Sequence, residues 1–242
     1  MLRALPRFTM DYPGHGQFVP FRKGDPEGNR WLDNESLFID WSAKNVIWLF
    51  ENSGKKAANM PVIRNPHNYL VTGIAFSRHG RHVALKFRLQ VPSVFDAASP
   101  RLTSTYKGIS TEFLLAVLNS FIPTYFIKKL LNNTWYEMSD LRQLPLVMPT
   151  RGQEKRLKEL AERAMEAKRL TFAGATPPNE LVASVRALSD ELAAKAPAYL
   201  HPSAQLKLLH TAADCLAVLE LAVNWEAEKL YGVEGLGPFD EF

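Results

Sequence analysis

The most constraining feature of this sequence is a change in the spacing of apolar residues after Pro149. Before it, turn residues separate short apolar runs, of which the clearest are Leu37–Trp41, Val46–Phe50, Tyr69–Phe76 and Val83–Leu89. After it, apolar residues recur at helical spacing over long stretches. Short runs bounded by turns are typical of strands, and long stretches with a 3.6-residue period are typical of helices. The pattern predicts an α+β chain, with a mixed β-sheet domain over residues 1–150 and a helical appendage over residues 151–242.

The run at 83–89 has the alternation of a half-buried strand. Its odd positions are apolar, whereas Lys86 and Arg88 occupy even positions. Successive side chains of a strand point to opposite faces, so we expect Lys86 and Arg88 on the open face. The turn that leads into this run then forms a cationic hairpin tip, which contains Arg78, His79, Arg81 and His82.

Five helices are expected beyond residue 110, near 111–119, 123–131, 153–170, 180–195 and 203–230. Ser110 suits the N-cap of the first helix, and Pro123 suits the first turn of the second. The last helix is unusually apolar, because only Asp214 and Glu220 are charged between Ala212 and Val223. Such a helix is buried in its own bundle or against another chain, and both alternatives remain open from the sequence.

Composition and charge narrow the class of protein. Residues 1–150 hold 18 Lys and Arg against 11 Asp and Glu, a net charge of +7, whereas residues 151–242 hold 11 against 14, a net charge of −3. A basic first part favours a polyanionic partner. One cysteine, Cys215, excludes an internal disulfide. Because no apolar stretch reaches about 18 residues and the N-terminus lacks a secretory pattern, we expect a cytoplasmic protein with no membrane partner.

One longer stretch carries a resemblance to a known family. Residues 110–150 read S-T-E-F-L-L-A-V-L-N-S-F-I-P-T-Y-F-I-K-K-L-L-N-N-T-W-Y-E-M-S-D-L-R-Q-L-P-L-V-M-P-T. Upstream, in order, stand V-P-F-R-K-G-D-P-E-G at 19–28, I-D-W-S at 39–42, P-V-I-R-N at 61–65, G-I-A-F-S-R at 73–78 and P-S-V-F-D at 92–96. This order resembles the target-recognition, or specificity, domain of TaqI-like, single-chain adenine-specific DNA methyltransferases of restriction-modification or phage-defence systems.

The resemblance implies a chain that reads double-stranded DNA while a separate catalytic part methylates adenine. The catalytic subunit or domain is then the partner that binds S-adenosylmethionine, and this chain itself carries no cofactor. An adenine methyltransferase needs a Gly-rich donor loop and an Asn-Pro-Pro-aromatic motif. Residues 65–68 read N-P-H-N, and the glycines at 232–237 follow a helix instead of a strand. We therefore expect no catalytic residue here, and the six histidines show no metal-ligand spacing.

Three polar clusters are the candidate DNA contacts, because Arg and Lys bind phosphate and Arg and Asn read base edges. The first is the hairpin tip and its strand, with Arg78, His79, Arg81, His82, Lys86 and Arg88. The second is a turn with Arg64, Asn65, His67 and Asn68, and the third is Arg22 with Lys23. Trp41, Trp48 and Trp135 are instead expected in the core, since apolar runs flank them.

Two other functions remain open. The chain also suits a half-specificity subunit of a multi-subunit restriction enzyme, in which a recognition domain precedes a long helix that docks the methylating subunits. A protein-interaction module without a DNA role is the third possibility. If the chain is a methyltransferase recognition part or a half-specificity subunit, the helix at 203–230 serves assembly. A fragment of residues 1–170 is then expected to fold and bind DNA without this helix.

Overall fold

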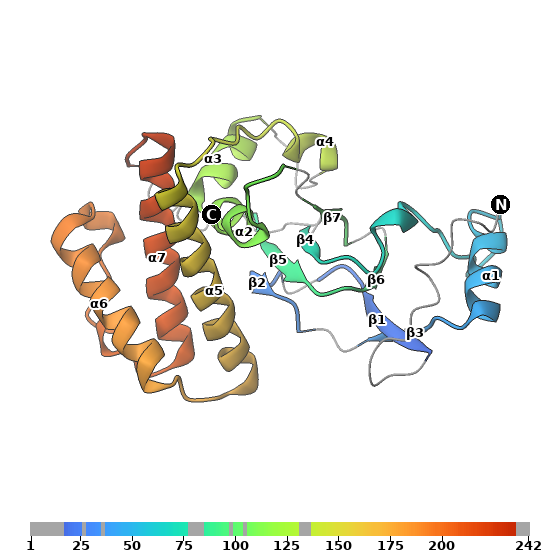
Figure 1. Cartoon of the computed structure of the whole chain (residues 1–242), viewed down its shortest axis with the longest axis horizontal. Coiled ribbons are helices and arrows are strands. Elements are labelled where there is room, and N and C mark those ends of the chain that lie inside the picture. Colours follow the sequence, from blue (N-terminus) through green and yellow to red (C-terminus); the bar gives the residue numbers. More distant parts are fainter. Residues whose placement is uncertain are drawn as a thin grey trace.

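The structure is a computed structural model, and it describes residues 17–25, 28–34, 37–76, 85–96, 99–103, 106–130 and 137–235. Three long helices stand together at one end of the molecule, a small lobe with helix α1 (Ala43–Asn52) lies at the other, and short strands fill the middle (Figure 1). Both helices and two small mixed sheets are present, which agrees with the expected α+β class.

The larger sheet has the order β2-β5-β4-β7. Its strands are β2 (Trp31–Leu32), β5 (Phe87–Gln90), β4 (Gly73–Phe76) and β7 (Arg101–Leu102). Strands β4 and β5 are antiparallel, from Gly73 opposite Gln90 to Phe76 opposite Phe87. The predicted pairing of these two apolar runs is therefore confirmed, while the connection at 77–84 lies outside the described residues.

The smaller sheet has the order β3-β1-β6 and belongs to the small lobe. Its strands are β1 (Phe18–Arg22), β3 (Phe38–Asp40) and β6 (Val94–Phe95). The apolar run at 46–50 is helical and lies in α1, which Ser42 caps by accepting a hydrogen bond from the backbone N–H of Asn45.

Trp41 is buried as expected, but Trp48 is 45% exposed on α1, so the prediction that it belongs to the core is wrong. Trp135 lies outside the described residues.

The helices beyond residue 110 follow the sequence prediction closely. They are α2 (Thr111–Asn119), α3 (Phe121–Leu130), the short α4 (Met138–Leu141), α5 (Arg151–Ala173), α6 (Asn179–Lys195) and α7 (Ala212–Tyr231). Short 3-10 turns occur at Pro66–Asn68, Ala198–Leu200 and Leu206–Leu208. Ser110 caps α2 as expected. The start of the last helix was predicted nine residues too early, because Thr211 and Asp214 form a reciprocal capping box that starts α7 at Ala212.

Two apolar cores hold these elements together. The larger core includes Trp31 and Phe87 from the sheet, Phe113 from α2, Leu157 from α5 and Val218 from α7. The smaller core lies in the small lobe and is formed by Val19, Trp41, Val46, Tyr69, Val94 and Phe95. The larger core thus contains residues from both sides of residue 150. The functional division proposed there stays a prediction, but the packing does not separate the chain at that point.

Cys215 is buried in α7, as expected for a small core residue, and burial raises the pKa of its thiol. Among the described helices, none combines the length and the apolar character that a membrane crossing requires.

Candidate nucleic-acid interface

The turn at 61–70 presents the second predicted cluster of polar residues. Asn65 has a left-handed backbone with φ 49°, a conformation that Asn tolerates better than most residues. The chain then makes a short 3-10 turn, in which the Asn68 N–H donates to the Asn65 carbonyl at 2.9 Å. Arg64, Asn65 and His67 are exposed, and Asn68 is half-buried. The structure therefore brings all four predicted residues of this cluster together on one surface turn.

A buried arginine that the sequence analysis did not single out fixes this turn from below. Arg101 of β7 is 5% exposed, and its Nη1 donates to the backbone carbonyls of Asn68, at 3.4 Å, and Val71. Its Nη2 donates to Gln90 Oε1 at 3.1 Å and to Ser93 Oγ at 2.6 Å. Burial lowers the pKa of Arg101 to about 10, so the guanidinium stays charged at neutral pH. The turn is thus anchored to strand β7 through its own carbonyl groups.

Tyr69 anchors the same turn to the small apolar core. Its ring packs edge-on against Trp41 at a centroid distance of 6.0 Å and against Phe95 at 5.0 Å. Burial raises the pKa of the Tyr69 hydroxyl, against the opposing effect of a backbone hydrogen bond from Arg64. The Arg101 guanidinium covers the Phe95 ring at 4.7 Å. Because Tyr69 and Arg101 hold both the start and the end of the turn, its exposed side chains project from a rigid base.

A cleft of about 170 Å³ lies beside this turn. Its lining comes from the turn, from the end of β6 and from the start of α4, and comprises Val62, Arg64, Asn65, Asn68, Phe95, Asp96, Pro100, Arg101, Glu137 and Met138. Both signs of charge are present, since Arg64 and Arg101 face the same cleft as Asp96 and Glu137. Arg101 already donates to protein groups, and Asp96 accepts from the Ser99 N–H at 3.1 Å. The cleft therefore joins charged groups that have structural partners with apolar walls.

Two of the predicted DNA contacts are buried ion-pair partners. Arg88 is 0% exposed, and its Nε lies 3.8 Å from Asp33 Oδ2. Arg22 is also buried, with its Nε 3.2 Å from the same carboxylate oxygen. The expectation that Arg88 lies on an open face is wrong, because both faces of β5 are covered. Alternation in a sequence shows which residues share a face of the strand, but it does not show what packs on that face. Neither arginine is accessible to DNA in this arrangement.

The remaining predicted contacts divide into described and undescribed residues. Lys23 is exposed just after β1. Lys86 is half-buried, and its side chain passes so close to Gly28 that a β-carbon there would lie 3.0 Å from the lysine Cδ. Arg78, His79, Arg81 and His82 lie outside the described residues. The described part of the predicted interface is therefore the 64–68 turn with Lys23 and Lys86.

Three of the motifs that carry the family resemblance contain side chains that hydrogen-bond to backbone groups. The Asn119 side chain accepts a hydrogen bond from the Phe87 N–H at 3.0 Å and donates to the Phe87 carbonyl at 2.9 Å, so it satisfies both backbone groups of this residue at the start of β5. In I-D-W-S, Asp40 accepts from the Ser42 N–H at 2.9 Å and so shapes the entry to α1. In K-G-D-P-E-G, Asp25 accepts from the N–H groups of Gly28 and Asn29. These short polar residues recur at turns because they satisfy backbone groups there.

Arg101 and Asp33 were the important residues that sequence reasoning missed. Each is an isolated charge among ordinary residue types, so its burial is set by elements that are distant in the sequence. Arg101 directly follows Pro100 and precedes the apolar Leu102. Many surface turns have the same pattern, so it does not indicate that Arg101 is buried.

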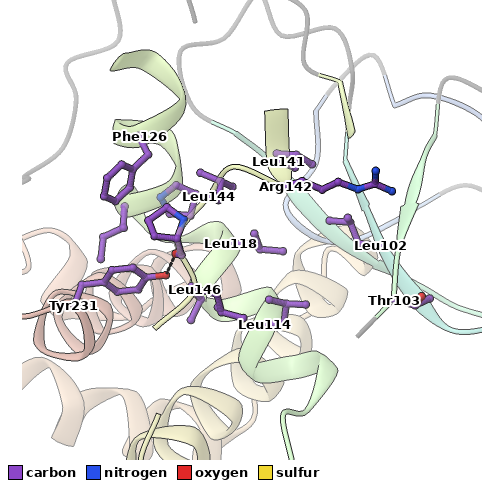
Figure 2. A pocket seen from close by; sticks show the side chains of 14 residues that line it. Leu102, Thr103, Leu114, Leu118, Phe126, Leu141, Arg142, Leu144, Leu146 and Tyr231 are labelled. Atoms are coloured by element: carbon purple, nitrogen blue, oxygen red, sulfur yellow. Dashed lines mark hydrogen bonds between the residues drawn. The ribbon is translucent and has the colours of Figure 1, made fainter. Parts of the chain in front are cut away.

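A second cavity lies on the helical side of β7 and is largely apolar. It measures about 270 Å³, and its lining includes Leu114 and Leu118 of α2, Phe126 of α3, Leu141 of α4 and Tyr231 of α7. Figure 2 shows these side chains around the cavity, with the Tyr231 hydroxyl donating to the Pro145 carbonyl at 2.7 Å. Arg142 is the charged residue at its edge. The apolar lining suits packing against a hydrophobic group and offers little for a phosphate backbone.

Within the described ranges, no three His, Cys, Asp or Glu side chains come together in a way that could hold a metal ion. Comparison with known proteins adds no assignment, since no protein-family model and no curated protein matches the chain.

Proposed function

We propose that this chain is the DNA sequence-recognition part of a bacterial adenine-specific DNA methyltransferase of a restriction-modification or phage-defence system. Catalysis, S-adenosylmethionine binding and adenine flipping belong to a separate catalytic subunit or domain, and the complex acts in the cytoplasm. The chain itself is not an enzyme on this proposal. Its task is to hold the catalytic partner on a short DNA site.

The observation that carries the proposal is the rigid polar turn at 64–68. Direct readout of DNA needs side chains with forked donors or amides, held in fixed positions on a surface. Arg64 carries a forked donor and Asn65 an amide, and the ring nitrogens of His67 lie on the same turn. The buried guanidinium of Arg101 fixes the backbone that presents them. Loops on a rigid scaffold are the usual place for recognition residues. The basic charge of residues 1–150 supports contact with phosphate in addition.

Salt dependence of DNA binding tests this proposal. We expect the logarithm of the affinity for a duplex oligonucleotide to fall linearly with the logarithm of salt concentration, with a slope of roughly −0.9 per phosphate contact. The double variant Arg64→Ala/Lys23→Ala should flatten the slope by about one to two units if both side chains contact phosphate. If Arg64 reads a guanine instead, the loss is sequence-dependent, at about 1–3 kcal/mol.

A matched control removes the same charge elsewhere. Arg186 and Lys195 are exposed on α6, far along the chain from the turn, and Arg186→Ala/Lys195→Ala should leave the slope unchanged. An equal effect of the two double variants would mean that only net charge matters. A purified chain that shows no duplex binding at low salt would contradict the proposal and favour the protein-interaction alternative.

A further inference from the structure

The exposed face of α1 carries a large aromatic side chain that neither apolar core uses. Trp48 is 45% exposed, and the neighbouring Ile47 is 42% exposed. Lys44, also exposed, precedes Trp48 by four residues, and residues four apart are neighbours on a helix surface. Figure 1 shows α1 at the end of the molecule opposite the three long helices. An indole in this position is accessible to a binding partner.

Two hydrogen bonds extend this row of side chains past the end of the helix. Asn52, four residues after Trp48, donates from its side-chain amide to the Trp48 carbonyl at 2.7 Å. Lys55 Nζ in turn donates to Asn52 Oδ1 at 2.9 Å. The row Lys44, Trp48, Asn52 and Lys55, here called the α1 stripe, therefore has an ammonium group at each end and an indole between them.

The stripe ends beside the 64–68 turn. The Gly54 N–H donates to the Pro61 carbonyl at 2.9 Å, and the Ile63 N–H donates to Ser53 Oγ at 2.9 Å. These bonds hold the residues that directly precede the turn against the C-terminal end of α1. The α1 stripe and the 64–68 turn are therefore neighbouring parts of one surface of the small lobe.

The charge of this surface favours nucleic acid over protein as its partner. Residues 43–64 contain three lysines and Arg64 against a single carboxylate, Glu51, so their net charge is +3. Lysine is depleted in protein–protein interfaces relative to the rest of the surface, whereas protein–DNA interfaces are much more positively charged. An exposed tryptophan between two lysines matches the second kind of interface.

The spacing of the stripe suits the major groove of a duplex. Lys44 and Asn52, which holds the Lys55 ammonium, are eight residues apart, or about 12 Å along a helix. The major groove is about 12 Å wide and admits an α-helix, whereas the minor groove is about 6 Å wide. Two cations at this separation can bind phosphates on opposite sides of the major groove, while the apolar centre faces the base edges and the thymine methyl groups.

We infer that the exposed face of α1 binds the major groove of duplex DNA. Lys44 and Lys55 contact phosphates on its two sides, and Trp48 with Ile47 contacts the base edges between them. The inference rests on the proposed DNA-recognition function, and it adds α1 to the interface beside the 64–68 turn.

Fluorescence anisotropy with a labelled mixed-sequence duplex tests the apolar contact. Trp48→Ala should weaken binding roughly fivefold or more, because the exposed part of the indole no longer becomes buried against DNA. Leu208→Ala removes a side chain that is 54% exposed and precedes α7, and it should keep the affinity. Thermal unfolding of both variants should match the full chain, since both side chains are largely outside the cores.

The salt dependence of binding tests the two lysines. Lys44→Ala/Lys55→Ala should flatten the slope of log affinity against log salt by about one to two units. The matched double variant Arg186→Ala/Lys195→Ala, which removes the same charge from exposed positions of α6, should keep the slope.

Tryptophan fluorescence and groove-specific competitors test the placement. Saturating duplex should change the tryptophan emission of the chain, and most of this change should be absent in Trp48→Phe. Methyl green, which occupies the major groove, should displace the chain from the duplex. Netropsin, which occupies the minor groove, should displace it much less.

The outcomes separate the inference from the proposed function. Absence of duplex binding by the unaltered chain overturns the proposed function and the α1 site with it. Clear binding that keeps its affinity in Trp48→Ala and its slope in Lys44→Ala/Lys55→Ala overturns the α1 site alone. A dimer that Trp48→Ala dissociates in gel filtration, with DNA affinity unchanged, also overturns it and identifies this face as a contact between two copies of the chain. Displacement by netropsin and not by methyl green overturns the assignment to the major groove.

Discussion

At the scale of single residues, buried charges determine which predicted contacts are available. Arg22 and Arg88 looked like surface cations in the sequence, yet they share the Asp33 carboxylate in the interior. Arg101 looked like an isolated turn residue, yet it holds the end of the 64–68 turn through the Asn68 and Val71 carbonyls. Burial of a guanidinium needs hydrogen-bond or ion-pair partners, and those of Arg22, Arg88 and Arg101 lie in other elements of the fold.

Asp33→Asn should therefore destabilise the protein strongly. The change removes the carboxylate that two buried arginines share, and loss of one partner from a buried pair costs about 3–5 kcal/mol. Urea denaturation followed by circular dichroism measures the free energy of unfolding. As a control, Glu162→Gln removes one partner of the exposed pair with Lys158, at 3.9 Å, and should change stability by less than about 0.5 kcal/mol. A loss for Asp33→Asn below about 1 kcal/mol would contradict the structural role of this carboxylate.

At the scale of elements, the caps and turns are encoded locally and the strands are not. Ser42, Ser110 and Thr211 each accept a backbone hydrogen bond at a helix start, as their types and positions suggest. The strands have two to five residues, too few for a clear alternation. Their positions depend on partners such as Asn119, whose amide bonds to the backbone of Phe87 in β5. Among these three caps the sequence analysis had identified Ser110, whereas the start of α7 was predicted nine residues too early.

At Asn65 in the 64–68 turn, the effect of the backbone conformation on stability can be measured separately from the effect of the side chain on DNA binding. Asn65 has φ 49°, so Asn65→Gly should keep the turn and the stability, whereas Asn65→Val should cost about 1–2 kcal/mol because a β-branched residue disfavours this conformation. If the amide contacts DNA, Asn65→Gly should weaken binding even though the fold is intact. Thermal unfolding and anisotropy titrations with the same duplex measure the two effects. Full affinity in Asn65→Gly would remove this side chain from the interface.

At the scale of the whole molecule, the C-terminal helices complete the core of the sheet. Glu220 of α7 accepts a hydrogen bond from Trp31 Nε1 at 2.7 Å and pairs with Arg30 at 3.2 Å. Asn224 of the same helix accepts from the Phe121 N–H at 2.7 Å, at the start of α3. These contacts join α7 to β2 and α3, both of which precede residue 150. A helix in this position is part of the same folding unit as the sheet.

Deletion of residues 171–242 should therefore unfold the remaining chain, contrary to the expectation from the sequence that residues 1–170 fold alone. The deletion exposes Leu157 and the rest of the buried face of α5. Circular dichroism and gel filtration of the fragment measure the outcome. In the full chain, Val218→Asp should also abolish folding, while Ala213→Asp, at an exposed position of the same helix, should be tolerated. A monomeric fragment with cooperative unfolding would show that the two parts fold independently.

The sequence by itself determined the mixture of strands and helices, the helices beyond residue 110 with the Ser110 cap, the pairing of the runs at 69–76 and 83–89, and the polar turn at 64–68. These features depend on local periodicity and on the chemistry of caps and turns, which are written in neighbouring residues. Only the tertiary structure decided that Arg22 and Arg88 are internal, that Arg101 supports the turn, that Trp48 is exposed and that α7 closes the larger core. Burial depends on which distant elements pack together, and a single sequence does not encode that packing in any short segment.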